Sequence, residues 1–259
     1  MERLGPTARV TLDRPEVRNA FNAELIAALT ATFVTLGEES PDALRVVVLA
    51  GDGPVFCAGA DVAWMRTAAS LDVDANEADA GRLATMLETI DTCPVPVVTR
   101  VHGAALGGGM GLCAVSDIVV STADATFGFT ETRLGILPAV IGPFALAKIG
   151  ESHARALFLA GSRFGAERAR EIGLVHEVVP DEAAADARVA ELVEELLAAG
   201  PTAVREAKGL IRRLRGQPAP QARALTVAAI ARQRTSPEGQ EGLSAFLEKR
   251  GPAWKDTTR

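Results

Sequence analysis

HGAALGGGMGLCAVSD, residues 102–117, joins a predicted strand to a predicted helix through five glycines. The apolar run before it, residues 95–101, is rich in β-branched residues and predicts a buried strand. Three of the glycines are consecutive, which is costly inside a regular element because glycine loses more backbone entropy on folding than alanine. The pattern predicts a tight turn, at the start of a helix, whose backbone another group approaches closely.

A helix that begins in such a turn has several N–H groups without partners and the positive end of its dipole at one point. This arrangement suits an anion or the oxyanion of a reacting carbonyl group. No Gly-Lys-Ser/Thr follows the glycines, and Leu112 stands where a dinucleotide-binding pattern needs glycine. On the glycines alone, close packing of the helix against the strand is an equally good interpretation.

The composition limits the class of protein. The chain has 259 residues, 48% of them apolar, and its net charge of −6 argues against a general nucleic-acid surface. No signal peptide and no uninterrupted apolar run of about 18 residues is apparent, so we expect no membrane segment and a cytoplasmic location. The three cysteines are an odd number, lie in apolar surroundings and show no paired spacing, which is typical of buried thiols. No histidine stands in a metal-binding motif.

The order of predicted elements favours one α/β domain over residues 1–198, followed by a helical region over 199–259. Strands at 8–13, 45–50 and 175–179 alternate with helices at 22–38, 80–92 and 181–198, and further helices are predicted at 143–149, 152–160, 166–172 and from Ser236 to about Arg250. The near-continuous apolar strand at 45–50 favours a parallel sheet. Residues 66–80 are polar without clear periodicity, which predicts a surface connection, either a mobile lid or a plain solvated loop.

A second turn of small residues, AGAD at 58–61, also lies between an apolar segment and a helix, and Asp61 is placed to cap that helix. If the two turns face each other, one N–H from each can hold a single carbonyl oxygen as an oxyanion hole. Glu131 is the best candidate for the acid or base. It follows an apolar strand, and burial there would raise its pKa.

Four segments in this order resemble the crotonase superfamily of enoyl-CoA hydratases and isomerases: FCAGAD at 56–61, HGAALGGG at 102–109, SDIVVSTADATFGFTETRLGILP at 116–138 and ARALFLAGSRFGAERAREIGLVHEVV at 154–179. The resemblance extends from about residue 8 to 255. It implies a crotonase-like spiral of ββα units with a C-terminal helical trimerisation region. It also implies fatty-acid or branched-chain amino acid catabolism.

The resemblance implies an acyl-CoA thioester whose carbonyl oxygen accepts hydrogen bonds from the N–H groups of Ala60 and Gly108, with Glu131 as acid and base. No cofactor is needed, since CoA is part of the substrate. A homotrimer or a dimer of trimers is the assembly implied. The residues that the resemblance places near the substrate or its CoA are Val17, Arg18, Ala20, Ala58, Asp61, Val62, Gly107, Pro138, Ala139 and, from the last helix and often a neighbouring subunit, Phe246 and Lys249.

One departure from the family matters for the reaction. Typical hydratases of the superfamily carry two glutamates, and Gly111 stands in place of the first. The flanking residues GGGMGL and TETRLGILPAVIGPF resemble a methylglutaconyl-CoA hydratase-like branch with the same glycine. In that branch Ala139 keeps the backbone N–H that positions water, provided that its φ is negative.

Three functions follow as alternatives: a hydratase of short or branched 2-enoyl-CoA, which we favour, a 3,2-enoyl-CoA isomerase that uses Glu131 alone, and a CoA-ester binding protein with little catalysis. Trp64 and Met65 are expected to line the acyl pocket or simply to pack in the core. Acidic residues at 72–79 disfavour a dicarboxylic acyl group unless Arg66 or Arg133 faces the pocket. The sequence leaves open whether Arg133 pairs with Glu131 instead.

Overall fold

The computed structural model of the chain describes residues 1–258, and its centre is a six-stranded sheet. The strand order is β1 (Glu2–Leu4), β2 (Thr7–Leu12), β3 (Val46–Gly51), β4 (Val97–Val101), β6 (Ile118–Thr122) and β9 (Glu177–Val179). Strands β2, β3, β4, β6 and β9 are parallel, and only the edge strand β1 is antiparallel. The predicted parallel sheet is confirmed, and β1 is an addition.

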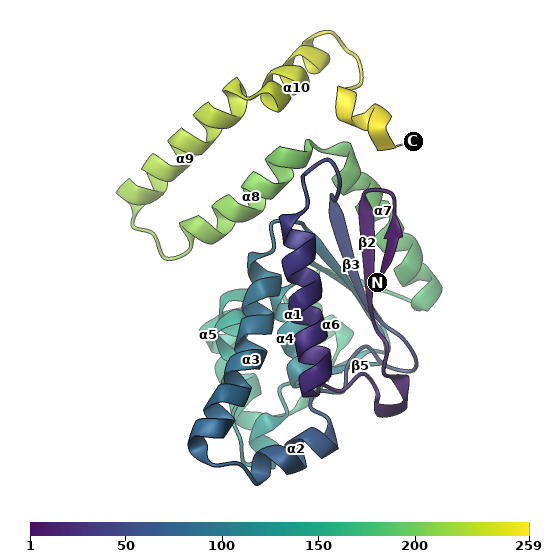
Figure 1. The fold of residues 1–259 in the computed structure, drawn as a ribbon, viewed down its shortest axis with the longest axis vertical. Coiled ribbons are helices and arrows are strands. Elements are labelled where there is room, and N and C mark those ends of the chain that lie inside the picture. The colour runs from purple at the N-terminus through teal and green to yellow at the C-terminus, as the bar shows by residue number, and fades with distance from the viewer. Residues whose placement is uncertain (259) are drawn as a thin grey trace.

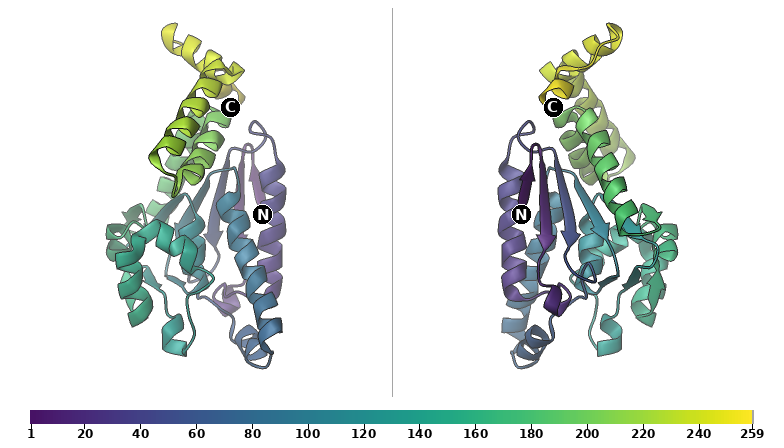
Figure 2. Two further views of the ribbon diagram at one scale, coloured as in Figure 1. Left: turned by 90° about the vertical axis from the view of Figure 1, so that its left-hand side faces the viewer. Right: turned by 90° about the vertical axis from the view of Figure 1, so that its right-hand side faces the viewer.

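The sheet is covered on both faces, which explains why β3 is apolar at successive positions (Figures 1 and 2). Val47 and Leu49 belong to the core cluster formed with α1 (Ala23–Glu38) and α3 (Val73–Thr92). Val46 and Val48 point the other way, because side chains alternate along a strand, and they pack against α7 (Glu182–Ala198).

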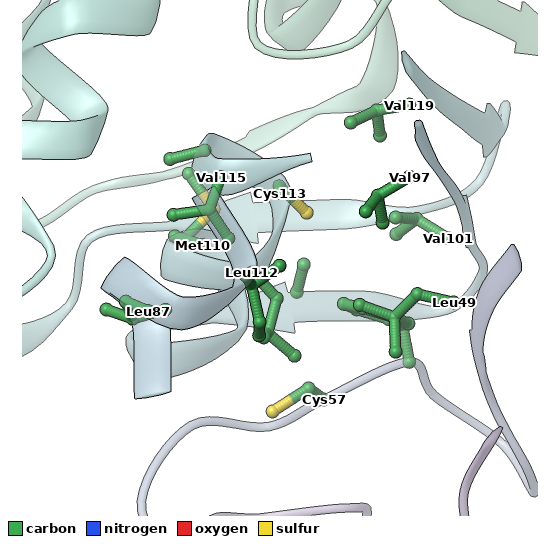
Figure 3. Close-up of a cluster of buried hydrophobic side chains, with 14 of the residues drawn as sticks. Leu49, Cys57, Leu87, Val97, Val101, Met110, Leu112, Cys113, Val115 and Val119 are labelled. Carbon is green, nitrogen blue, oxygen red and sulfur yellow. The ribbon is translucent and has the colours of Figure 1, made fainter. Parts of the chain in front are cut away.

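The glycine-rich segment lies in the middle of this core. It forms β5 (Ala104–Leu106) and α4 (Gly108–Val115), and seven of the eight residues of α4 are buried. Figure 3 shows Met110, Leu112, Cys113 and Val115 among the side chains of the sheet and of α3. Strand β5 pairs with β7 (Thr126–Gly128), which pairs with β8 (Arg163–Gly165) in a second small sheet. The sequence analysis did not predict β8.

The prediction of a loop over residues 66–80 is wrong. The segment contains the second half of α2 (Val62–Ala69) and the first two turns of α3. Helix α3 starts where Asp72 accepts a 2.9 Å hydrogen bond from the N–H of Ala75, and the Asn76 amide donates to the carbonyl oxygens of Ala68, Leu71 and Asp72. Capping and side-chain bonds of this kind form helices that apolar periodicity does not reveal.

The remaining helices follow the predicted order. Helix α5 (Gly142–Ala160) is interrupted at Gly150, between the two predicted segments, and α6 (Ala166–Glu171) follows β8. The C-terminal region contains α8 (Pro201–Leu214), α9 (Ala219–Thr235), α10 (Pro237–Leu247) and the 3₁₀ segment η3 (Ala253–Thr258). Ser236 caps α10 as predicted, but the helix ends at Leu247, three residues before the predicted end. Figure 1 shows α8–α10 beyond one end of the sheet and α2 at the opposite end.

The connection from β4 to β5 depends on Gly103. Its φ is +61°, and a Cβ atom added there would lie 2.2 Å from the carbonyl oxygen of Pro54. Gly5 has nearly the same φ, +60°, but open space around it. A comparison of alanine substitutions at the two positions therefore distinguishes the free-energy cost of a left-handed backbone from that of a steric collision with another backbone segment.

We expect Gly103→Ala to lower the free energy of unfolding by about 3 kcal/mol or more, and Gly5→Ala by about 1 kcal/mol. Urea unfolding at one fixed protein concentration measures both. Equal losses for the two variants would show that the close approach of Gly103 to Pro54 does not constrain the fold.

Candidate active site

The two turns of small residues lie directly beside each other. The N–H of Cys57 donates to Ala104 and the N–H of Leu106 donates to Cys57, both at 3.0 Å. A Cβ atom on Gly59 would lie 3.1 Å from the carbonyl oxygen of Leu106, so the two backbones are close to contact there. The expected juxtaposition of AGAD with the glycine-rich turn is therefore present.

Each turn presents a backbone N–H that is free of protein partners. Within residues 1–258, the amides of Ala60 and Gly108 donate to no other protein atom. Gly108 is the first residue of α4, so its N–H has no acceptor within the helix and lies at the positive end of the dipole. The ring of Phe21 lies against Gly108, and a Cβ atom there would approach the ring to 2.6 Å. A side chain at 108 would therefore have to displace the buried ring of Phe21.

The segment after β2 runs along the AGAD turn. Ala58 donates to Arg18 at 3.0 Å, and Phe21 both donates to Gly59 at 2.7 Å and accepts from Asp61 at 2.9 Å. Arg18 is exposed, Val17 half-buried and Ala20 buried. The structure thus brings the predicted CoA-contacting segment and the turn together.

Two polar residues that hold this region were not found from the sequence. The side chain of Asn19 is fully buried and donates to the carbonyl oxygens of Asp52 and Val55. The guanidinium of Arg14 pairs with Asp61 at 2.9 Å. Asp61 caps α2 as predicted, and the hydrogen bonds from Ala63 and Arg14 lower the pKa of its carboxyl group. Only the three-dimensional arrangement identifies these partners, because Arg14 and Asp61 are 47 residues apart.

A cavity of about 590 Å³ opens over the two free amides. Phe21 and three groups of residues line it: the turns, the α2–α3 helices and the segment from Thr130 to Ile141. The lining residues are Phe21, Ala58, Gly59, Ala60, Trp64, Met65, Ala68, Asn76, Asp79, Ala80, Leu83, Gly107, Gly108, Thr130, Glu131, Leu134, Ile136, Leu137, Pro138, Ala139, Val140 and Ile141. Most of them are apolar, so the cavity suits an uncharged chain with one polar end at the amides.

Glu131 contributes a carboxyl group to this cavity from a half-buried side chain. Its atom Oε2 is buried and has no hydrogen-bond partner among the described residues, and a Cβ atom on Gly107 would lie 3.5 Å from its Oε1. Burial raises the pKa of Glu131 above its ordinary value, and the carboxyl group's bond to its own backbone amide opposes this only partly. Arg133 is not among the groups that shift that pKa in the part of the chain described. A carboxyl group of this kind is typical of a general acid or base.

The position of Gly111 is closed to a second carboxyl group in this conformation. A Cβ atom there would lie 2.7 Å from Cγ2 of Ile141 and 3.3 Å from both terminal methyl groups of Leu87. These apolar side chains occupy the volume that a larger residue at 111 would need. A single substitution to glutamate would therefore also have to displace Ile141.

Other predicted site residues are divided between the cavity and the far end of the molecule. Pro138 and Ala139 line the cavity, and Ala139 is not among the residues with positive φ, so its N–H has the conformation that the sequence analysis required. Val62 starts α2 and is 59% exposed outside the cavity lining. Phe246, on α10, is 80% exposed, and α10 lies at the opposite end of the molecule from α2 (Figure 1). Lys249 follows α10, so one chain does not bring these two residues to the cavity.

Other kinds of site are not apparent in residues 1–258. No group of three or more His, Cys, Asp or Glu side chains is arranged to hold a metal ion. None of the described helices is both long and apolar enough to cross a membrane. The three cysteines are free and buried, and burial raises the pKa of Cys57 and Cys113 to about 12. These two thiols therefore stay protonated at neutral pH and are poor nucleophiles.

Comparisons with known proteins agree on one family. Residues 5–257 match the family model described as Enoyl-CoA hydratase/isomerase. An enoyl-CoA isomerase/hydratase of Mycosarcoma maydis is 31% identical over 253 residues, which cover 94% of this chain and 90% of the relative. The solved enoyl-CoA hydratase of Shewanella pealeana has 36% identity and a TM-score of 0.91, covering 97% of this chain and 93% of that one. That of Mycobacterium smegmatis has 33% identity and a TM-score of 0.91, with 96% and 95% covered.

The buried carboxyl group of Glu131 predicts a stability change that depends on pH. Because its pKa is raised in the folded state, the folded protein binds this proton more tightly than the unfolded chain does. Glu131 therefore lowers the free energy of unfolding of the wild type only as the pH rises from about 4.5 through the raised pKa. We expect the free energy of unfolding of Glu131→Gln to exceed that of wild type by about 1 kcal/mol at pH 8. At pH 4 the two free energies of unfolding should be equal.

Urea unfolding of both proteins at the two pH values measures the difference. The matched control is Glu88→Gln, which alters an exposed glutamate of α3 and should change stability equally little at both pH values. A Glu131→Gln variant that is less stable than wild type at pH 8 would contradict the burial of an unpaired carboxylate.

Proposed function

Because the chain belongs to the enoyl-CoA hydratase/isomerase family and shares its crotonase-like fold, we propose that it hydrates a short or branched 2-enoyl-CoA thioester. The observation that carries the proposal is the unpaired carboxyl oxygen of Glu131 in the same cavity as the free amides of Ala60 and Gly108. One group is suited to move a proton, and the two amides are suited to hold the charge that develops on the thioester oxygen.

In the proposed reaction, Glu131 takes a proton from water while the water oxygen bonds to C3 of the substrate. The electrons of the C2=C3 bond move to the thioester oxygen, which the amides of Ala60 and Gly108 stabilise as an enolate. Glu131 then returns the proton to C2, so water has been added across the double bond and the carboxylate is regenerated. The N–H of Ala139, on the same cavity, is a second group that can position the water. No step needs a cofactor.

An isomerase is the second candidate, favoured by the apolar side chains that close position 111. In that reaction Glu131 removes a proton from C2 of a 3-enoyl-CoA and returns it to C4, which moves the double bond into conjugation with the thioester. The same enolate forms between the two transfers. A single carboxyl group is sufficient because no water has to be activated.

The absorbance of the conjugated thioester distinguishes the candidates. Loss of absorbance with crotonyl-CoA or 3-methylcrotonyl-CoA supports the hydratase, whereas a gain with 3-hexenoyl-CoA supports the isomerase. Binding of these esters without any change in absorbance would leave the third alternative, a CoA-ester binding protein, as the function.

We also propose that the chain works as a homotrimer or a dimer of trimers. The support is apolar surface on the last two helices, where Val227, Ile230, Leu243, Phe246 and Leu247 are between 48% and 80% exposed. Exposed apolar groups gathered in this way are typical of protein interfaces. In such an assembly Phe246 and Lys249 of a neighbouring copy would lie near the CoA. Light scattering of the purified chain, whose subunit mass is 27.0 kDa, tests the assembly.

For the reaction itself, we expect Glu131→Gln to lower kcat for crotonyl-CoA by roughly 10²–10⁴, with a much smaller change in KM, because the amide cannot transfer the proton but leaves the cavity's shape unchanged. Glu88→Gln should retain wild-type rates. In the wild type, kcat should fall at low pH with a midpoint above the ordinary glutamate value of 4.5, since the base must be ionised. Full activity of Glu131→Gln would exclude the assigned role.

A further inference from the structure

The cavity that holds Glu131 contains one other charged residue, Asp79. It lies on α3 with Asn76, Ala80 and Leu83, and these four residues share one face of the helix because they are three, four and seven positions apart. Asp79 is 7% exposed, although aspartate is rarely buried without a reason. No lysine, arginine or histidine of residues 1–258 lines the cavity. Both charges on its wall are therefore negative.

The partner of Asp79 is outside the cavity and in contact with solvent. Oδ1 of Asp79 accepts a hydrogen bond from the guanidinium of Arg82, whose side chain is 57% exposed. Solvent screens an exposed guanidinium, so Arg82 offsets the charge that Asp79 presents to the cavity only in part. No donor to Oδ2 occurs among the described residues. The wall formed by α3 therefore keeps a negative charge next to the apolar lining.

A ligand carboxylate in this cavity would lose hydration without meeting a cation. It would also share the cavity with the carboxylates of Asp79 and Glu131, and like charges repel each other more strongly in a poorly hydrated cavity than in bulk water. An uncharged chain of the same shape suffers neither penalty and gains contacts with Leu83, Trp64 and Met65. The cavity wall therefore discriminates by the charge of the acyl group.

We propose that Asp79 is a specificity-determining residue that excludes acyl groups with a second carboxylate, so that the site takes uncharged acyl chains. The inference rests on the proposed function, in that the acyl chain of a CoA thioester fills this cavity. It also separates this chain from the methylglutaconyl-CoA branch that its motifs resemble, because a methylglutaconyl group carries a free carboxylate. Neither Arg66 nor Arg133, the two arginines that could have received that group, lines the cavity.

The test compares two saturated thioesters that the enzyme cannot hydrate. Glutaryl-CoA and 5-methylhexanoyl-CoA have the same three methylene groups, and they end in a carboxylate and in an isopropyl group of similar size. Titration calorimetry gives the ratio of their Kd values. We expect the wild type to bind the uncharged ester at least about tenfold more tightly. In Asp79→Asn this ratio should fall roughly tenfold, through tighter binding of glutaryl-CoA.

Three further variants separate the charge of Asp79 from other effects. Glu77→Gln removes an exposed charge from the same helix and should leave the ratio unchanged. Arg82→Gln breaks the ion pair but retains the carboxylate, so the ratio should stay or increase; a fall there would assign the selectivity to the ion pair and overturn the proposal. Asp79→Ser removes the carboxylate without adding a cation, so the ratio should fall as in Asp79→Asn, and this variant serves if Asp79→Asn does not fold.

An unchanged ratio in folded Asp79→Asn, or in Asp79→Ser if that is the variant that folds, overturns the proposal. The absorbance assay with crotonyl-CoA is independent of this result. If crotonyl-CoA is not hydrated but the Kd ratio responds as expected, the proposed reaction fails while the selectivity of Asp79 stands. If hydration occurs and glutaryl-CoA binds as tightly as the uncharged ester, only the role of Asp79 is wrong.

Discussion

The hydrogen bonds that join Cys57 to Ala104 and Leu106 are the contacts on which the rest of the site depends. They place the AGAD turn and the glycine-rich turn side by side, and each turn then starts a helix, α2 or α4. With the turns fixed in this way, the free amides of Ala60 and Gly108 open on one cavity without any side chain having to be positioned. Backbone donors fixed by neighbouring backbone hydrogen bonds are rigid, which is what stabilisation of a developing charge requires.

Burial has opposite consequences on the two sides of α4. Toward the core, its apolar residues fill the space between the sheet and α3, as Figure 3 shows, and stabilise the fold. Toward the cavity, the same exclusion of water leaves the Glu131 carboxyl group without a partner and raises its pKa. The site thus has a group that is unfavourable for stability and useful for proton transfer, a common relation in enzymes.

Much of this could be predicted from local sequence patterns. The parallel sheet, the central glycine turn, the cap at Asp61 and the break near Gly150 each have a signal within a few residues. The end of α2 and the first two turns of α3 were missed because hydrogen bonds from Asp72 and Asn76, rather than apolar periodicity, define the helix boundary there. The Arg14–Asp61 pair and the buried Asn19 were missed because their partners are distant in the chain. The closure of position 111 by Ile141 and Leu87 depends on packing, which no single sequence position encodes.

The cavity is built from separate parts of the chain with separate tasks. The two turns supply the amides and the Thr130–Ile141 segment supplies Glu131, whereas much of the remaining wall is one face of α3 and its neighbour α2. Substitutions at Asn76, Ala80 or Leu83 therefore alter the shape and polarity of the wall without touching the reacting groups. In evolutionary terms, the choice of substrate and the type of reaction are separable traits here. A gene duplicate could acquire a new acyl range through changes on a single helix while keeping its chemistry intact.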